Sequence, residues 1–435
     1  MELYNLVSFT GIFILIGLAW LVSRFIFKNT TTPNFSLIVW GIGLQLLFAF
    51  FIFVVPAGMT LFKIINDFVI LVLSKASAGA SFVFGPLAST PGKSDSIGFI
   101  LAFQALPTII FFSSLMAIFY YYPILPFIIR QFARLFSKLM KISGAESLCA
   151  ASNIFVGVEA AFTVKPYIEE MTDSELNTIL TAGMATVASN VMALYVFTLQ
   201  SQFPSIAGHL ISASFLSAPA ALIMSKLFLP ETQTPVTMGK TVDVHYERDA
   251  SLFEAIINGS LSGLKVIFNI TALLIAVLGL VALLDMALGG MGNVVNAWMG
   301  LSIEWTLKSI IGWLFYPFTL IIGIPVSDAS IVSQIIGERL ILTEVASYQD
   351  LALAIKNHTL IHPRSAIITA YALCGFAHVA SMAIFVGGIT ALAPKRTADI
   401  SKVAFSALIA ATFACLMTAC IAGTFFNKTS ILLGS

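Results

Sequence analysis

The sequence predicts an all-α integral membrane protein with about eight transmembrane helices, two re-entrant hairpins arranged as an inverted repeat, and one interfacial helix. The composition of the chain and one pattern in its sequence predict this class. Hydrophobic residues make up 58% of the 435 residues and charged residues only 10%, and the mean hydropathy is +0.97. Such a chain is dissolved mostly in lipid. The pattern is a series of apolar runs of about 20 residues, the length that a helix needs to cross a bilayer.

Each predicted span is one of these runs. Five of them qualify on length and hydrophobicity alone: 6–27, 35–56, 98–123, 263–284 and 403–424. Three more contain Ser, Asn, His, Pro or Gly, which a lipid-facing helix does not favour, so we expect them to face protein: 178–197, 209–229 and 366–391. The first run lacks a basic start and a small-residue cleavage site, so we expect a retained helix rather than a signal peptide.

The segment 59–74 is shorter than a span and carries Lys63 and Asp67. Charged residues on a short apolar helix favour a position in the membrane interface. We therefore expect an interfacial helix there, and the alternative is a ninth span.

Two hydrophobic regions, 125–167 and 305–348, are interrupted midway by Gly, Pro and acidic residues. Each resembles a re-entrant hairpin, and each precedes one of the polar spans. A helix broken at membrane depth must have its backbone groups satisfied by protein or water, so such breaks concentrate at transport sites. Their recurrence in corresponding positions of two halves predicts an inverted repeat with its binding site near the midplane.

The distribution of basic residues predicts the orientation. Eight spans place both termini on one side, and more than half of the 22 Lys and Arg residues face the cytoplasm if that side is outside. The polar stretch 231–249 is then a cytoplasmic linker. The expected divisions are an N-terminal scaffold at 1–97, a first transport half at 98–230, a linker at 231–262 and a second transport half at 263–435.

Several other functional classes find no support in the sequence. A formal net charge of +1 gives no electrostatic case for nucleic-acid binding. The four Cys residues show no CxxC spacing and are expected to be packing thiols. His358 and His362 have the i, i+4 spacing of a zinc pair, but no HExxH motif is present and Pro363 disturbs the helix. Neither an enzyme, with a nucleophile and its base, nor a channel filter is indicated.

Carboxylates at membrane depth are costly and are therefore candidates for function. Glu159 and Glu344 lie in the two predicted hairpins, and Asp328 lies in the second. The alternative for the two Glu residues is a structural ion pair with Lys165 or Arg339.

A Gly and a His also interrupt the apolar run 366–391, within Tyr371-Ala372-Leu373-Cys374-Gly375-Phe376-Ala377-His378. This stretch resembles a signature of the concentrative nucleoside transporters, which carry Asn in place of His378. The segments 103–115 and 214–221 resemble two further signatures of that family.

The hairpins resemble the family with substitutions. The first keeps Asn153, Phe155, Gly157 and Glu159, but Val158 stands where the family carries a Gln-Thr pair, so one residue is missing. The second, 337–348, has Arg for a Lys and Thr for an Asn and retains the family's Glu as Glu344.

The resemblance implies a homotrimeric, cation-driven importer of nucleosides in the plasma (inner) membrane. It implies that Glu344, His378 and Ser381 meet the ribose hydroxyls. It further implies that Gly157, Val158 and Glu159 face the base and that Phe376 lines the pocket. Val158 cannot replace a hydrogen-bonding amide, so base discrimination is expected to be reduced.

The resemblance also implies a sodium site. Its ligands would be the Asn153 side chain, the Val156 carbonyl, the Asn190 side chain and the Val191 carbonyl. Neutral oxygens suit a hard cation. The alternative is proton coupling through Glu159 or His378, and a carrier of nucleobases or nucleoside analogues is the alternative for the substrate. No other cofactor is expected.

Overall fold

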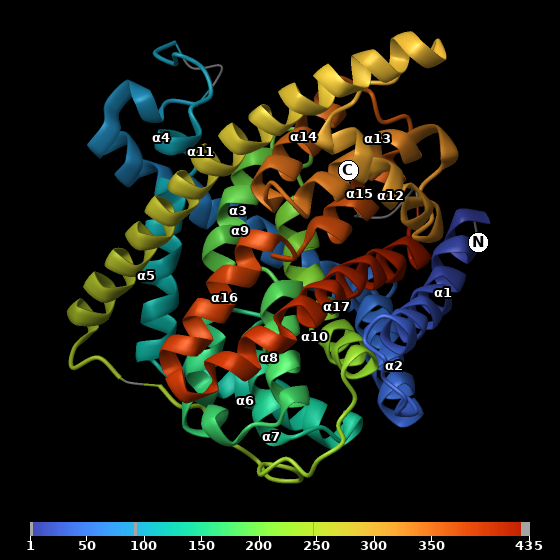
Figure 1. Cartoon of the computed structure of the whole chain (residues 1–435). Helices are drawn as coiled ribbons and strands as arrows, with labels where there is room; N and C mark the ends of the chain where they lie inside the picture. The colour runs from blue at the N-terminus through green and yellow to red at the C-terminus, as the bar shows by residue number, and fades with distance from the viewer. Residues whose placement is uncertain (1–2, 91–93, 247, 428–435) are drawn as a thin grey trace.

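The computed structural model describes residues 3–90, 94–246 and 248–427, which fold into helices joined by turns and by longer loops, such as the one between Phe228 and Leu252 (Figure 1). The α-helices are α1 (Leu3–Phe25), α2 (Phe35–Phe53), α3 (Pro56–Phe84), α4 (Leu101–Gln104), α5 (Pro107–Tyr121), α6 (Ile124–Met140), α7 (Gly144–Ser152), α8 (Asp173–Ala185), α9 (Ser189–Leu199), α10 (Ile206–Phe228), α11 (Leu252–Met299), α12 (Leu307–Ile321), α13 (Val326–Arg339), α14 (Glu344–Lys356), α15 (Pro363–Leu373), α16 (Val379–Leu392) and α17 (Thr397–Thr424). Three 3-10 helices are η1 (Gly85–Ala88), η2 (Val158–Glu170) and η3 (Pro394–Arg396). The predicted all-α membrane class is confirmed.

Polar caps fix where individual helices begin. Ser143 Oγ accepts a hydrogen bond from the N–H of Glu146, whose carboxylate accepts one from the N–H of Ser143 at the start of α7. Thr172 and Glu175 repeat the same arrangement at the start of α8. Each capping box satisfies two backbone donors that the first turn leaves unpaired.

The helices divide into a buried centre and an exposed periphery. In the most apolar windows of α8–α9, α10 and α17, 89% of the residues are buried, whereas none is buried in that of α11. Figure 1 shows α11 as a long diagonal helix along one side of the molecule, with α5 beside it. Polar and small residues therefore concentrate in helices surrounded by protein, and α11 presents its apolar surface outward.

Eight helical segments of the described chain are long and apolar enough to cross a membrane, which matches the expected number, but the set differs. It includes α3, because this helix has 29 residues and continues into η1. It omits the 366–391 region, because the break between α15 and α16 leaves two short helices.

The side chain of Asn66, in the middle of α3, accepts a hydrogen bond from the N–H of Gly208 in the first turn of α10. The middle of α3 thus lies beside one end of α10. This is the position expected of the interfacial helix that the sequence predicts at 59–74.

The two halves follow the same order of elements. In the first, α5 is followed by α6, the hairpin α7–η2, the broken pair α8–α9, and α10. In the second, α11 is followed by α12, the hairpin α13–α14, the broken pair α15–α16, and α17. This order agrees with the predicted internal repeat.

Both hairpins are shorter than the regions 125–167 and 305–348 that the sequence indicated. A separate helix, α6 or α12, precedes each of them. In α6, Ile129, Ala133 and Phe136 are buried on one face, whereas Arg134 and Lys138 are exposed on the other. The boundary prediction was wrong because an amphipathic helix beside a hairpin adds apolar residues that hydropathy alone cannot separate from the hairpin arm.

Gly375 lies in the break between α15 and α16. Its φ of +151° belongs to the region that side-chain-bearing residues avoid, and a Cβ there would lie 2.8 Å from the Ala185 carbonyl oxygen and 2.6 Å from Cys415 Sγ. Glycine therefore lets this break pack directly against the end of α8.

Candidate functional site

A cavity of about 610 Å³ lies where the two hairpin tips, the two helix breaks and α11 meet. Among the residues predicted from the sequence, its walls include Gly157, Val158, Glu159, Asn190, Val191, Glu344, Phe376, His378 and Ser381. Asn153 and Val156, the other two predicted residues, lie in the same hairpin tip but do not line the cavity. Residues far apart in the chain thus converge on one volume, large enough for a small-molecule ligand.

The carboxylate of Glu344 is held by groups from two other segments. Glu344 begins α14 and its side chain is buried. Tyr195 of α9 donates a hydrogen bond to Oε1 over 2.6 Å, and Nε2 of His378 lies 2.8 Å from Oε2. Oε2 is itself buried and has no hydrogen bond of good geometry within the described residues, so this oxygen of the carboxylate keeps an unused acceptor beside the cavity.

His378 serves as the N-cap of α16. Its Nδ1 accepts a hydrogen bond of 3.2 Å from the N–H of Ser381. In the neutral ring this assigns the hydrogen to Nε2, which lies 2.5 Å from Ser381 Oγ. The ring nitrogen thereby supplies the capping acceptor that an Asn side chain supplies at such a position.

Arg339 does not pair with Glu344. Its Nη1 donates to the carbonyl oxygen of Ala372 at the end of α15, at 2.5 Å. At the other end of α15, Asp328 accepts hydrogen bonds from the N–H groups of Ile361 and His362 and from the hydroxyl of Ser365. Asp328 and Arg339, two of the charged residues of α13, thus complement the dipole of α15. The structure places Asp328 in a capping role outside the cavity.

The tip of the first hairpin contains a buried acceptor without a partner. Asn153 ends α7, and its Nδ2 donates to the Cys149 carbonyl oxygen over 3.0 Å. Its Oδ1 has no hydrogen-bond partner within the described residues. The nearby Phe155 carbonyl oxygen accepts from the N–H of Ser189, which ties the tip to the break between α8 and α9. A buried, unpaired amide oxygen fits a cation ligand.

Asn190 is differently engaged. Its Nδ2 donates to Ser113 Oγ of α5 over 3.2 Å, and its Oδ1 accepts from the N–H of Val191 over 2.9 Å. The carboxamide would have to turn away from these partners to ligate a cation, so the predicted role of Asn190 stays a prediction.

Sequence reasoning missed two parts of the site. Tyr195 carries no local signal, because its partner Glu344 is 149 residues away in the chain. The wall formed by α11 did leave a signal, since Asn269 is a carboxamide inside the apolar run 263–284. An isolated polar residue in a membrane-spanning run is a candidate for function.

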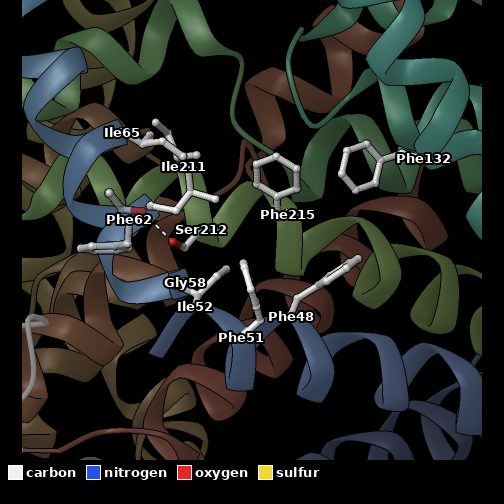
Figure 2. A pocket seen from close by; sticks show the side chains of 12 residues that line it. Phe48, Phe51, Ile52, Gly58, Phe62, Ile65, Phe132, Ile211, Ser212 and Phe215 are labelled. Atoms are coloured by element: carbon white, nitrogen blue, oxygen red, sulfur yellow. Dashed lines mark hydrogen bonds between the residues drawn. The ribbon is translucent and has the colours of Figure 1, made fainter. Parts of the chain in front are cut away.

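A second cavity, of about 280 Å³, lies between α2, α3, α6 and α10 (Figure 2). Figure 2 shows Phe48, Phe51, Phe132 and Phe215 around it. The hydroxyl of Ser212 donates to the Gly208 carbonyl oxygen within its own helix. This cavity therefore offers almost no free polar group to a sugar or a base.

The pair His358 and His362 does not form part of a metal cluster. Among the described residues no group of three or more His, Cys, Asp or Glu side chains is placed to hold a metal ion. His362 instead forms the N-cap position of α15, with Nδ1 3.4 Å from Asp328 Oδ2.

Family models match in three blocks: the Na+ dependent nucleoside transporter N-terminus at 10–87, a nucleoside recognition gate at 102–202, and the Na+ dependent nucleoside transporter C-terminus at 209–423. An uncharacterized transporter of Haemophilus influenzae is 38% identical over 97% of both chains. The chain belongs to the concentrative nucleoside transporter family. The prediction made from the motifs is confirmed.

Relatives within this family include mammalian proteins. The solute carrier family 28 member 3 of Mus musculus is 37% identical over 96% of this chain, and the mouse sodium/nucleoside cotransporter 1 is 34% identical over 97% of it. The chain spans 58% of the length of the former.

Solved structures of the family share the fold. The structure of CNTnw in an inward-facing substrate-bound state gives a TM-score of 0.87 at 32% identity, with 98% of each chain covered. A CNTnw variant in an outward-facing state also gives 0.87. As a family member with this fold, the protein is a multi-pass membrane protein.

Proposed function

We propose that the protein is a secondary active transporter that imports nucleosides by cation symport, with sodium as the coupling ion. One observation carries the proposal: Glu344, a buried carboxylate held by Tyr195 and lying beside His378, is part of the wall of a cavity between two broken helices. Family membership supports a nucleoside as the substrate.

Glu344, His378 and Ser381 are proposed to bind the ribose. A carboxylate oxygen accepts hydrogen bonds from hydroxyl groups more strongly than a neutral acceptor does. The Nε2–H of His378 and the hydroxyl of Ser381 lie next to the Glu344 carboxylate in the cavity wall. Both groups can donate hydrogen bonds to the oxygens of the sugar.

The base is proposed to lie toward Gly157, Val158 and Glu159, with Phe376 in the same cavity wall. Val158 and Phe376 offer apolar surface to the flat ring. Glu159 adds a carboxylate at the edge of this region.

Sodium is proposed to bind at the first hairpin tip. The unpaired Oδ1 of Asn153 supports this assignment, with the Val156 and Val191 carbonyls and the Asn190 side chain as further ligands. Proton coupling remains the second candidate, because His378 and Glu159 are titratable groups in the cavity wall.

We also propose that the protein assembles as a homotrimer, as the family resemblance implies. The exposed apolar surface of α11 and its position at the side of the molecule are compatible with a subunit interface. Chemical cross-linking in the membrane tests this assembly by the number of subunits in the largest product.

The deciding experiment is uptake into proteoliposomes that contain the purified protein. Labelled uridine, adenosine, guanosine and hypoxanthine are supplied with and without an inward sodium gradient. Sodium-stimulated uptake of nucleosides supports the proposal. Uptake of hypoxanthine alone would contradict it in favour of a nucleobase carrier, and uptake that follows a proton gradient without sodium would replace the coupling ion.

A further inference from the structure

We propose that Asn269 of α11 is a specificity-determining residue that hydrogen-bonds the nucleobase of the transported substrate. This inference rests on the proposed function, because it assigns one more contact within the same cavity.

The position of Asn269 follows from helix periodicity. Val266, Asn269, Ile270 and Leu273 are spaced i, i+3, i+4 and i+7, so they share one face of α11. All four line the cavity that contains Glu344. Asn269 is the hydrogen-bonding side chain on this face, and the other three are aliphatic.

The surroundings of Asn269 point to a polar ligand. The most apolar window of α11 has a mean hydropathy of 2.7, so a carboxamide there is costly unless its donors and acceptor are satisfied. Asn269 is exposed, and no hydrogen bond of its side chain exists within the described residues. A position facing the cavity gives the carboxamide hydrogen-bond partners that lipid cannot provide, because water or a substrate can occupy the cavity.

The groups proposed to bind the ribose lie on other segments than Asn269, so the base is the part of the substrate that Asn269 is assigned to contact, together with the first hairpin tip. The polar side chains that suit ribose, Glu344 and His378, belong to the second hairpin and the second break. Asn190 already uses its carboxamide on Ser113 and on its own backbone. A carboxamide presents a donor and an acceptor side by side, which matches the neighbouring N–H and C=O groups on the edge of a nucleobase.

The test is competition between nucleosides in proteoliposomes. Uridine, 2′-deoxyuridine, cytidine, adenosine and guanosine compete with a labelled transported nucleoside for the wild-type protein and for Asn269→Leu. Loss of one neutral hydrogen bond changes affinity roughly threefold to tenfold. We expect the ratio between the best and the worst base to change by that factor in the variant, while the ratio of uridine to 2′-deoxyuridine stays constant.

Two further variants keep the test decisive. Thr271→Val removes a hydroxyl from the same helix at a position outside the cavity lining and should leave every ratio unchanged. Asn269→Ser shortens the side chain while keeping a polar group, and it replaces the Leu variant if that variant does not reach the membrane.

Three results would overturn the inference. These are unchanged base ratios in both Asn269 variants, an equal loss of affinity for all bases, and a change confined to subunit cross-linking, which would make Asn269 an interface residue. Failure of the proposed function gives a different result, because the wild-type protein would then take up no nucleoside at all. That result would contradict both proposals.

Discussion

The hydroxyl of Tyr195 and the carboxylate of Glu344 form a 2.6 Å hydrogen bond that joins the two halves of the protein. Tyr195 belongs to the broken helix pair of the first half, and Glu344 opens the second arm of the hairpin in the second half. The ring of Tyr195 also stacks on Tyr348, at 4.6 Å between centroids. The orientation of the candidate ribose-binding carboxylate thus depends on contact between the halves.

Removing this hydroxyl should weaken substrate binding without loss of the protein. Tyr195→Phe keeps the ring and its stacking but deletes a hydrogen bond to a charged acceptor, which is worth about 1.5–3 kcal/mol. We expect the KM for uridine to rise roughly tenfold or more. Tyr348→Phe is the matched control, since its hydroxyl donates to the Ala370 carbonyl oxygen instead. Equal KM values in the two variants would contradict a positioning role for Tyr195.

Glu344→Gln should abolish nucleoside uptake at ordinary substrate concentrations. The substitution preserves volume but removes the charge, and loss of one charge-assisted hydrogen bond lowers affinity roughly tenfold to a hundredfold. Uptake of labelled uridine, normalised to the protein present in the membrane, measures this. Wild-type rate and affinity would show that the ribose is bound elsewhere.

Substrates with different bases should be discriminated only modestly. Val158 at the hairpin tip offers no hydrogen bond, and a site dominated by apolar contacts resolves substrates by about 10–200-fold. Competition among uridine, cytidine, adenosine and guanosine gives the range. Discrimination of about ten-thousandfold between uridine and adenosine would show a fully hydrogen-bonded base site, beyond what the single carboxamide of Asn269 can provide.

Sodium coupling should depend on the tip of the first hairpin. Asn153→Leu removes the unpaired Oδ1, and Asn190→Leu removes the other proposed side-chain ligand. Each should raise the sodium concentration for half-maximal uptake while the substrate affinity at saturating sodium is retained. The opposing outcome is uptake that ignores sodium, collapses with a protonophore and loses its pH dependence in His378→Asn, which would make His378 the coupling group.

Asp328→Ala should destabilise the second half rather than change substrate preference. The carboxylate accepts hydrogen bonds from two backbone N–H groups at the start of α15 and from Ser365, and a lost cap costs roughly 0.5–2 kcal/mol. We expect a lower thermal stability in detergent, with base ratios equal to those of the wild type. A shift in substrate preference with unchanged stability would contradict the capping role.

Much of the fold and part of the candidate site could be predicted from the sequence. Runs of apolar residues give helices of membrane length, and Gly375 and His378 mark a break because a polar, flexible stretch at membrane depth needs partners. Glu344 and Glu159 could be singled out because an isolated carboxylate in such a run is costly. These inferences use only local composition, which determines whether a segment enters the membrane and whether it stays helical.

Only the tertiary structure decided which groups meet. It separated α6 and α12 from the hairpins, assigned Asp328 and Arg339 to the two ends of α15, and directed the Asn190 carboxamide toward Ser113. It also brought Tyr195 to Glu344 across 149 residues and turned one face of α11 toward the cavity. The sequence alone determined the membrane class, the breaks and the costly polar groups, because these depend on the transfer of local segments into lipid. The pairing of those groups depends on how helices pack, and local sequence does not encode that packing.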